Sequence, residues 1–526
     1  MDDGRRQRLG APSLGRPGDN ARDLTDHLLV LAQRAHVVLP LFFAVAEGIF
    51  RIVRDIAIDP VSLNVVPGYE AVRVPLETSM MPTGLAWRPN GELVVSSLKG
   101  RVWTVQDTDG DGLEDQLTQF SDELAAPYGL YATDSYVDVV NKYGLLRLLD
   151  DDGDGRADRH VTIASGWGHT TDYHDWAVGL PRDAAGNYYI AIPCQQDDRS
   201  QAAAHLRGTV LRLSPCEATA ENPRTFEIQK VTAGHRFPMG IAMNRAQQLF
   251  VTDNQGNYNP FNELNHVQDG KRFGFINKVD RKPDFKPPLT PPAIDIPHPW
   301  TRSVNGICFL ETPENSGEQS TGKRFGPFEG HLVGCEYDTR RLIRISLQQV
   351  GDTFQGAAYP FSYNEAPSGP PFLGPLVCGI SPKGDLYVGG IRDSGWGGSN
   401  NVGELVRLRP IVEELPCGIA EVRATNSGFV IAFTKPVDRG RAADLANYTL
   451  ASYTRVSTPT YGGNDTQRRV EAIRAIQVAE DASSVKLEVG KMRAGFVYEL
   501  NLKNLTLDRS EFFPSQAHYT LRVIPD

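Results

Sequence analysis

Two short acidic segments have the residue types and spacing of cation-binding loops. They read DTDGDGLED from Asp107 and DDDGDGRAD from Asp150. Carboxylates at the first, third, fifth and ninth positions, with a glycine that allows a sharp turn, suit a hard cation that takes several oxygen ligands. The twelfth position is Thr118 or Val161 rather than Glu, so neither loop is a complete EF-hand. We expect calcium to be bound by two sets of carboxylates: Asp107, Asp109, Asp111 and Asp115, and Asp150, Asp152, Asp154 and Asp158.

Another segment combines a lone arginine with polar residues that follow an apolar run. It reads GHRFPMGIAMNRAQQLFVTDNQGNYNPFNELNHV from Gly234 to Val267. Arg236 precedes a Pro238-x-Gly240 turn, and the strand-like run ends in Asp253-Asn254-Gln255-Gly256. A surface loop that leads into a β-hairpin has the same local pattern, so its meaning depends on the surrounding elements.

Those elements come from a unit that recurs six times. Each unit has a turn with a glycine and then a short apolar strand, as in PTGLAWRPNGELVVSS and PMGIAMNRAQQLFVTD. The anchoring glycines are Gly84, Gly129, Gly179, Gly240, Gly306 and Gly379. A third strand with basic interruptions follows most units, as in GRVWTVQD and GELVRLRP. Three or four short strands in each unit of roughly 45 residues or more predict a six-bladed β-propeller over residues 65–410; a β-sandwich would show shorter and more even spacing.

The repeat stops after Pro410, and residues 417–526 show a different pattern. Alternating strands such as GFVIAFTKPV, SSVKLEVG and FVYELNLKNL predict an immunoglobulin- or fibronectin-like β-sandwich. The segments DLANYTL and AHYTLRVIPD fit the edges of such a module. No group of chemically reactive residues stands out in it, so we expect a role in packing or adhesion.

The composition describes a globular protein with many turns. The 526 residues are 40% hydrophobic and 22% charged, and the 50 glycines and 36 prolines favour an all-β fold over helices. The net charge of −10 argues against binding to nucleic acid or to an anionic membrane surface.

The N-terminal residues 1–46 have the pattern of a signal peptide. Arginines precede the apolar run AHVVLPLFFAVA, which is about a dozen residues long and too short to span a bilayer comfortably. Ala44-Val45-Ala46 has the small-x-small pattern of a cleavage site, which predicts export; an uncleaved anchor or a buried helix is the alternative. The six cysteines form no CxxC or CxxCH motif, and in an exported protein Cys194 could pair with Cys216 and Cys308 with Cys335.

The antiparallel order of strands within a blade sorts the polar residues onto two faces. Residues before the first strand share a face with the ends of the second strand, whereas both acidic loops follow a third strand and lie on the opposite face. The first face therefore carries His174, Arg236 and Arg302 together with Lys99, Lys142, Gln195, Asp253, Asn254, Gln255, Glu336, Tyr337, Arg392 and Asp393. Single loop cations are usually only solvated, but five of them converge here from five blades, flanked by Trp167, Trp176, Trp300 and Trp396. Polar groups with aromatic walls suit a sugar or a flat conjugated cofactor.

With the repeat and these residues combined, residues 65–410 resemble the soluble pyrroloquinoline-quinone (PQQ) glucose/sorbosone dehydrogenase family. Related planctomycete propellers of the membrane-bound dehydrogenase type are similar too. The segment GHRFPMGIA…LFVTDNQG…NELNHV…GKRFGF is similar to the family's G-x-R-N-P-x-G segment with its downstream D/E-L-N and G-x-x-Y/F-G-W. His174 ahead of GLPRDAAGNYYIA is similar to the family's histidine ahead of a strand pair.

The resemblance implies a catalytic site. In the family, a histidine takes a proton from the sugar hydroxyl while hydride passes to the quinone, and an arginine stabilises the developing negative charge. Carried over, His174 is the base and Arg236 the electrophile, and the cofactor is held by Lys142, Gln255, Arg302 and Arg392. Phe237 departs from the family's Asn, and the spacing after His174 is shorter, which leaves His169 or Asp172 as alternatives for the base.

The implied protein is a periplasmic or secreted oxidoreductase. It would oxidise a sugar or related alcohol or aldehyde with PQQ and pass electrons to an external acceptor, since no haem motif follows the propeller. A non-catalytic propeller that binds carbohydrate or protein at a cell surface is the main alternative. A calcium-dependent lactonase is a further class, for which no Glu-Asn-Asp-Asp metal cage is found in the central pocket.

Overall fold

The computed structural model describes residues 58–172, 174–194, 200–219, 224–277, 282, 284–314, 323–364, 370–395, 400–507 and 510–526. The predicted signal peptide, Gln195 and Trp396 lie outside these residues. No helix among the described residues is long and apolar enough to cross a membrane.

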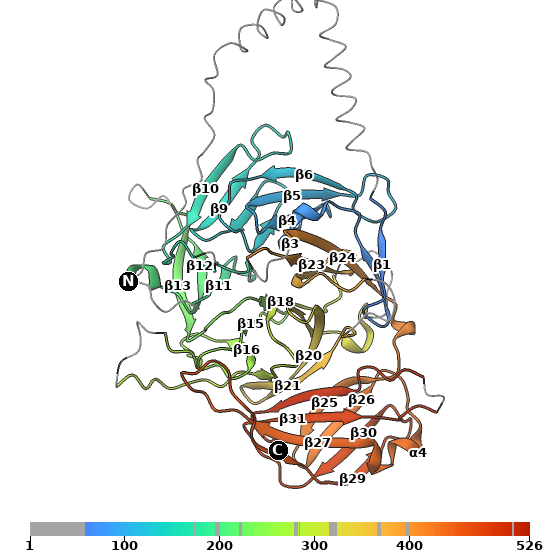
Figure 1. The fold of residues 1–526 in the computed structure, drawn as a ribbon. Coiled ribbons are helices and arrows are strands. Elements are labelled where there is room, and N and C mark those ends of the chain that lie inside the picture. Colours follow the sequence, from blue (N-terminus) through green and yellow to red (C-terminus); the bar gives the residue numbers. More distant parts are fainter. Residues whose placement is uncertain are drawn as a thin grey trace, which may run out of the picture. The chain divides into compact units, whose positions relative to one another are not determined.

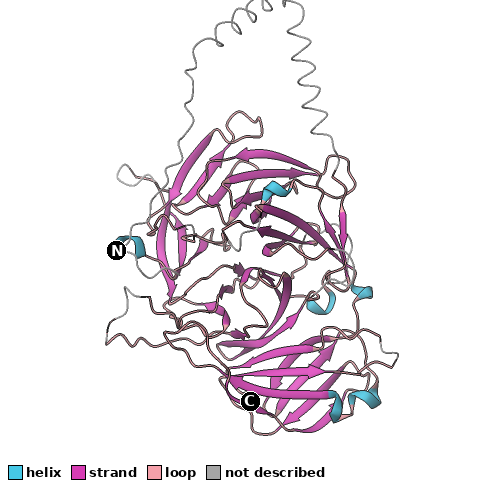
Figure 2. Ribbon diagram, in the orientation of Figure 1, coloured by secondary structure: helices cyan, strands magenta, loops and turns pink. Residues whose placement is uncertain are grey.

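The all-β prediction is confirmed, and in the described part of the chain helices are limited to short turns (Figure 2). The helical pieces are η1 (Thr78–Met80), α3 (Gln201–Ala204), η2 (Gly326–Phe328), η3 (Val412–Glu414), α4 (Arg439–Ala442) and η4 (Leu445–Asn447).

The described strands between Val61 and Pro410 form six antiparallel sheets that follow one another in chain order (Figure 1). Sheet one contains β3 (Pro82–Trp87), β4 (Leu93–Ser97), β5 (Arg101–Gln106) and β6 (Gln116–Ser121). Sheet two contains β7 (Leu130–Ala132), β8 (Val137–Val140), β9 (Leu145–Leu149) and β10 (Arg159–Ala164), and sheet three β11 (Tyr188–Ile192), β12 (Thr209–Pro215) and β13 (Phe226–Ala233). Sheet four contains β14 (Ile241–Met243), β15 (Leu249–Asp253), β16 (Asn262–Val267) and β17 (Ile294–Ile296). Sheet five contains β18 (Val304–Phe309), β19 (Leu332–Glu336), β20 (Arg341–Val350) and β21 (Thr353–Pro360), and sheet six β22 (Pro375–Ile380), β23 (Leu386–Arg392) and β24 (Val402–Pro410).

The six anchoring glycines lie where each inner segment meets the next sheet. Their missing side chains permit this close approach, because a Cβ on Gly240, for example, would lie 2.0 Å from the carbonyl oxygen of Asn305. Added Cβ atoms would touch the next sheet at every position: Gly84 at Gly129, Gly129 at Gly179, Gly179 at Ile241, Gly240 at Asn305, Gly306 at Leu376 and Gly379 at Trp87. The contact of Gly379 with Trp87 returns to the first sheet, so the six sheets close into a ring.

An N-terminal strand completes the last sheet. β2 (Tyr69–Arg73) pairs with β24 from Tyr69 opposite Pro410 to Arg73 opposite Val406, and β1 (Val61–Leu63) pairs with β2. The ring is therefore closed by main-chain hydrogen bonds between the two ends of the propeller region, a contact that the repeat alone did not predict.

The inner segment of sheet three is less regular than the repeat predicts. It contributes only isolated bridges, Val178 with Ala191 and Arg182 with Tyr188. Gly179 has a φ of +78° and Pro181 has no N–H to donate, so this segment cannot form a continuous ladder.

The C-terminal residues form two packed antiparallel sheets. One contains β25 (Ile419–Thr425), β26 (Gly428–Phe433), β30 (Ser484–Val489) and β29 (Ile473–Val478). The other contains β28 (Thr466–Val470), β27 (Tyr448–Thr454), β31 (Phe496–Leu502) and β32 (Gln516–Leu521). Their facing side chains, including Phe429, Tyr498 and Tyr519, form one buried cluster.

The prediction that DLANYTL and AHYTLRVIPD fit the edges of the module is wrong for DLANYTL but right for AHYTLRVIPD, whose β32 is the last strand of the module's own sheet. β27 lies between β31 and β28, and β32 lies between β31 and β21 of the propeller. Gly356 to Ala358 pair with Thr520 to His518, so one eight-stranded sheet runs from the fifth propeller sheet into the C-terminal module. The edge interpretation failed for DLANYTL because a local strand pattern does not show whether a strand is paired on one side or on both.

Candidate active site

The predicted polar pocket on the ring axis is filled instead by apolar side chains. Tyr128 stacks on Trp176 at 5.3 Å between ring centroids, and Trp176 contacts Phe237 at 5.8 Å. All six sheets contribute to this buried cluster: Met81, Leu98, Tyr128, Trp176, Val178, Phe237, Met239, Tyr337, Leu376 and Ile391. These residues flank the inner strands, where side chains from all sides meet at one point, so the polar residues lie around the axis rather than on it.

Beside this cluster is a cavity of about 230 Å³, which we call the lysine pocket. It is lined by Lys99, Lys142, Trp176 and Asp393 together with Leu98, Ala125, Ala126, Tyr143 and Thr171. The Lys99 ammonium forms an ion pair with Asp393 that connects sheets one and six. Three of the residues predicted to face a ligand, Lys99, Lys142 and Asp393, are therefore brought to one cavity with one of the predicted tryptophans.

Lys142 is the most buried cation of this pocket. Its Nζ donates to the carbonyl oxygen of Thr170 at 3.1 Å and to that of Asp172, and Trp167 Nε1 donates to the Lys142 carbonyl oxygen at 2.9 Å. Burial lowers the pKa of Lys142, while the nearby carboxylates of Asp175 and Asp172 act in the opposite direction. An anion in the pocket would stabilise the charged ammonium.

His174 is held next to this pocket by a carboxylate. Its Nδ1 lies 3.1 Å from Asp172 Oδ1, and its ring lies 5.5 Å from Trp176 and 6.1 Å from Phe237. The imidazole is about one quarter exposed, at 23% of its side-chain surface. The alternative His169 packs on Tyr143 at 4.7 Å, so it also borders the pocket, whereas Asp172 orients His174.

Two carboxylates predicted to line the pocket have structural roles. Asp253 accepts hydrogen bonds from the backbone N–H groups of Arg236 and Phe237 at 2.8 and 2.6 Å. Glu336 does the same for Arg302 and Ser303. Each carboxylate, at the end of a second strand, holds the segment that enters the first strand of its own sheet. Burial raises the pKa of Asp253 to about 6 in spite of these donors.

Arg236 and Gln255 form a group of their own, which we call the arginine cluster. Arg236 is buried, and its Nη1 donates to the Gln255 carbonyl oxygen at 2.9 Å. The Gln255 carboxamide donates to Pro260 O at 3.1 Å. Phe237 follows Arg236 in sequence and contacts both His174 and Trp176, so the cluster adjoins the lysine pocket.

The remaining predicted residues differ in their surroundings. Arg392 lies over the Tyr337 ring at 5.1 Å, beside the axial cluster, whereas Arg302 is exposed. Trp300 does not flank the pocket: it packs on His518 of the C-terminal module, with ring centroids 4.6 Å apart. The repeat pattern predicted Trp300 near the pocket because contacts with the C-terminal module cannot be inferred from the propeller repeat.

The acidic loops lie between β5 and β6 and between β9 and β10, which is the opposite end of the sheets from the lysine pocket. Ligand atoms of Asp107, Asp109 and Asp111 lie within 4.8 Å of one another, as do those of Asp150, Asp152 and Asp158. The other two predicted ligands, Asp115 and Asp154, are not in these two groups, and their role as ligands stays a prediction. A cavity of about 590 Å³ opens at this same end, lined by inner-strand residues such as Gly84, Gly240 and Gly306.

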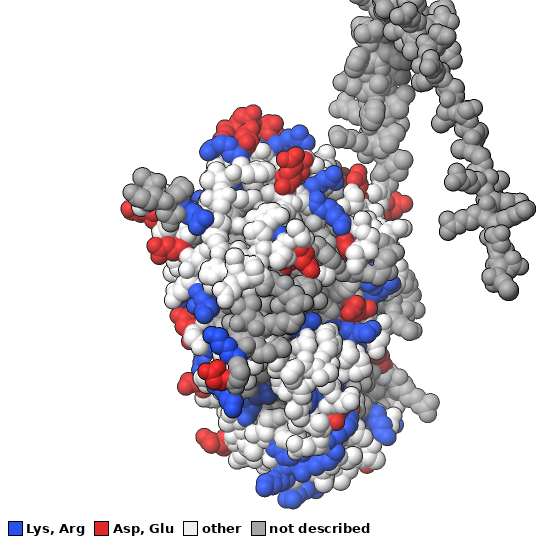
Figure 3. All heavy atoms as spheres, turned by 60° about the vertical axis from the view of Figure 1, so that its left-hand side comes forward, with Lys and Arg blue, Asp and Glu red and all other residues white. Residues whose placement is uncertain are grey.

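None of the six cysteines, all of which lie within the described residues, forms a disulfide, so the suggested Cys194–Cys216 and Cys308–Cys335 bridges are not formed. Both signs of charge are interspersed on the face drawn in Figure 3.

A family model and several solved structures match parts of the chain. Residues 62–290 match a family described only as a domain of unknown function, DUF7133. No curated protein matches. Among solved structures, an oxidoreductase of the glucose dehydrogenase type from Thermus thermophilus is 17% identical, with a TM-score of 0.46, covering 65% of this chain and 100% of that one.

Two further similar structures are of proteins described as binding or containing PQQ. The PQQ-bound aldose sugar dehydrogenase of Streptomyces coelicolor is 16% identical over 65% of this chain and 100% of that chain, with a TM-score of 0.43. The pyranose dehydrogenase PQQ domain of Coprinopsis cinerea is 12% identical over 66% and 97%, with a TM-score of 0.46. The similarity to these three proteins covers 65–66% of the chain. Because these TM-scores are below 0.5, its chemistry has to be inferred from its own side chains.

Proposed function

We propose that the protein is a sugar-oxidising dehydrogenase that binds PQQ in the lysine pocket. The observation that carries the proposal is the buried Lys142 ammonium, which donates to neutral carbonyl groups in a cavity whose lining includes Tyr143 and Trp176. A flat ligand with carboxylates would add negative charge next to this ammonium and contact the aromatic residues of the lining.

The residues around the pocket fit such a group. Lys142 and Lys99 would pair with carboxylates of the cofactor, and Arg392 would add a guanidinium from sheet six. When bound, the quinone would accept the hydride from the sugar. Arg236, carried over from the family resemblance, would stabilise negative charge from the neighbouring arginine cluster.

The protein's own residues would handle the proton. The Asp172 carboxylate accepts a hydrogen bond from Nδ1 of His174 and so fixes the orientation of the imidazole. His174 would then take the proton of the substrate hydroxyl at Nε2. Trp176 and Phe237, which contact the His174 ring, would exclude water from one side of the reacting groups. The substrate would be a sugar or a related alcohol or aldehyde, with an external electron acceptor.

Two further parts of the proposal concern calcium and location. The acidic loops would bind calcium as structural sites, since they lie at the opposite end of the sheets from the lysine pocket. The protein would be periplasmic or secreted, as its N-terminal pattern predicts.

The test is dye-linked aldose oxidation by the PQQ-reconstituted protein. His174→Ala should lower turnover by about 10²–10⁴-fold with little change in PQQ affinity, because removal of a general base acts on the chemical step. Arg236→Ala should lower both turnover and PQQ affinity. A wild-type protein that takes up no PQQ and oxidises no aldose would exclude this function.

A non-catalytic carbohydrate-binding propeller is the second candidate. The apolar cluster on the axis and the pairing of Lys99 with Asp393 favour it, since both reduce the polar surface left for a cofactor. The visible spectrum after addition of PQQ and calcium separates the two, because only the dehydrogenase would hold an absorbing quinone.

A further inference from the structure

A loop of the C-terminal module lies against the propeller segment that follows β15. This segment, residues 455–465, connects β27 with β28, and we call it the sandwich loop. The Tyr258 N–H donates to Thr458 O at 2.7 Å, and the Gly462 N–H donates to Gly256 O at 3.0 Å. Asn257 Nδ2 donates to Pro459 O at 2.6 Å. Backbone and side-chain hydrogen bonds thus bind the sandwich loop to residues 256–258, directly after Gln255.

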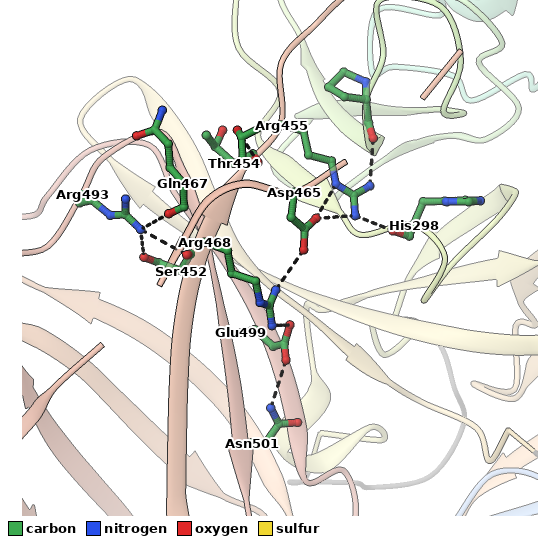
Figure 4. Close-up of polar contacts among 12 residues, drawn as sticks. His298, Ser452, Thr454, Arg455, Asp465, Gln467, Arg468, Arg493, Glu499 and Asn501 are labelled. Atoms are coloured by element: carbon green, nitrogen blue, oxygen red, sulfur yellow. Dashed lines mark hydrogen bonds and ion pairs between the residues drawn. The ribbon is translucent and has the colours of Figure 1, made fainter. Parts of the chain in front are cut away.

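The base of the sandwich loop is fixed by a buried arginine (Figure 4). The Arg455 guanidinium donates to Pro260 O at 3.1 Å and to His298 O at 2.5 Å on the propeller, and it forms an ion pair with Asp465 at 2.9 Å. It also lies over the Phe261 ring at 4.7 Å. Both ends of the loop are therefore joined through one side chain that is 6% exposed, which gives the loop a defined position on the propeller.

The tip of the sandwich loop reaches the arginine cluster. The Tyr461 ring lies 5.1 Å from the guanidinium carbon of Arg236, in a cation–π contact. Next to it, Gly462 has a φ of +70° and packs on the Gln255 carboxamide, where a Cβ would lie 3.1 Å from Nε2. Tyr461 nevertheless stays 61% exposed, so most of its ring faces solvent beside a buried guanidinium.

We propose that the sandwich loop forms one wall of the active site and that Tyr461 acts there in two ways. Its ring positions the Arg236 guanidinium, and its exposed surface is the platform on which a sugar ring stacks. A pyranose has an apolar face of C–H groups, which fits an aromatic ring, and hydroxyl groups at its edge, which fit nearby polar groups. The inference rests on the proposed function, because it assigns the sugar to the same site. It also gives the C-terminal module a role beyond packing or adhesion.

The test titrates the full-length protein, without PQQ, with D-glucose, D-galactose and D-xylose by isothermal titration calorimetry. Tyr461→Ala should weaken binding of the best aldose by roughly three- to tenfold, the loss expected for one aromatic contact. Tyr461→Phe keeps the ring and should restore the affinity. Tyr461→Leu keeps apolar bulk without the aromatic face and should bind as weakly as Tyr461→Ala. Val470→Ala is the control, since Val470 is 85% exposed on β28, outside the sandwich loop, and should leave affinity unchanged.

The positioning role has a separate readout. Tyr461→Ala should also weaken PQQ, measured by its absorbance in equilibrium titrations, and Tyr461→Phe should not. If the wild-type protein binds an aldose and Tyr461→Ala or Tyr461→Leu binds it equally well, the wall assignment is overturned while the proposed function stands. If the wild-type protein binds neither aldose nor PQQ, both fail together.

Discussion

Lys142 is a buried cation whose charge depends on the few groups that surround its ammonium. Its ammonium is buried, and its two hydrogen-bond acceptors described above are carbonyl oxygens. Carbonyl dipoles replace part of the lost hydration, while burial lowers the pKa of Lys142 and the Asp175 and Asp172 carboxylates act in the opposite direction. The contact of a carboxylate ligand with Lys142 would therefore contribute more binding free energy than a contact with an exposed lysine.

Lys142→Met should weaken PQQ binding by roughly ten- to hundredfold, the value of a hydrogen bond to a charged group. The free energy of unfolding should change little or rise, because the variant buries a thioether in place of an ammonium. Equilibrium titration with PQQ and chemical denaturation measure the two effects. Lys230→Met, on the exposed edge strand β13, is the control and should bind PQQ as the wild type does. Equal affinities for Lys142→Met and Lys230→Met would place the cofactor elsewhere.

At the scale of elements, the inner segments determine how the sheets assemble. Close approach needs glycine because the neighbouring backbone occupies the space of a Cβ, as at Gly129, where an added Cβ would lie 2.6 Å from the carbonyl carbon of Gly179. Neighbouring segments are further joined by hydrogen bonds such as that from Thr83 Oγ1 to Pro127 O at 2.6 Å. Ring closure is thus a property of backbone packing as well as of side-chain burial.

Gly129→Ala should lower the free energy of unfolding by about 2 kcal/mol or more, because the methyl group meets rigid backbone that cannot rotate away. Thermal unfolding followed by circular dichroism would record this as a lower Tm. Gly440→Ala in α4 is the control, since the nearest atom to its added Cβ is Asp438 Oδ1 at 3.4 Å, at the end of a side chain. Its Tm should be unchanged or slightly higher; an equal fall for both variants would contradict the packing account.

The acidic loops should connect calcium to stability. Asp109→Ala combined with Asp152→Ala should lower the Tm in calcium and remove the difference between calcium and chelator. A site that binds only the folded state contributes about 2.7 kcal/mol when calcium is at a hundredfold excess over Kd. Asp134→Ala, an exposed aspartate outside both loops, should keep the wild-type response. A wild-type Tm that is the same in calcium and in chelator would contradict the assignment of calcium to these loops.

At the scale of the whole molecule, the C-terminal module is joined to the propeller by buried polar contacts as well as by the shared sheet. The Arg344 guanidinium in β20 donates to Ile419 O at 2.9 Å and to Ala420 O at 2.7 Å. Arg522 forms an ion pair with Asp295 at 2.8 Å. Removal of the module would leave these groups without their partners, so we expect the two parts to unfold together.

His518 lies at this junction and should make stability depend on pH. Burial lowers its pKa to about 4, and the Glu499 carboxylate acts in the opposite direction. The unfolded chain would bind a proton near pH 6.5 while the folded protein does not, so stability is lost as the pH falls from about 6.5 toward 4. Between pH 7 and pH 5, protonation of His518 in the unfolded chain should lower the free energy of unfolding by about 2 kcal/mol. His518→Phe should reduce the loss by that amount in denaturation curves measured at both pH values; an unchanged loss would show that His518 does not titrate in this range.

Local patterns in the sequence determined much of this protein. The recurring glycines and apolar strands predicted the sheets of the propeller, because strand formation and close backbone approach depend on residues that are near in sequence. The same order of strands placed Lys99, Lys142 and Asp393 on one face and the acidic loops on the other. The assignment of His174 and Arg236 to catalysis stays a prediction that came from the resemblance.

Only the tertiary structure decided which side chains meet. Trp176, Phe237 and their neighbours fill the axis, and Asp253 accepts the backbone hydrogen bond of Arg236. Tyr461 lies against the Arg236 guanidinium. Tyr461 is separated from Arg236 by more than the length of a typical domain. Such contacts depend on how whole sheets pack, and a strand pattern is the same whether its face meets solvent, a ligand or another module.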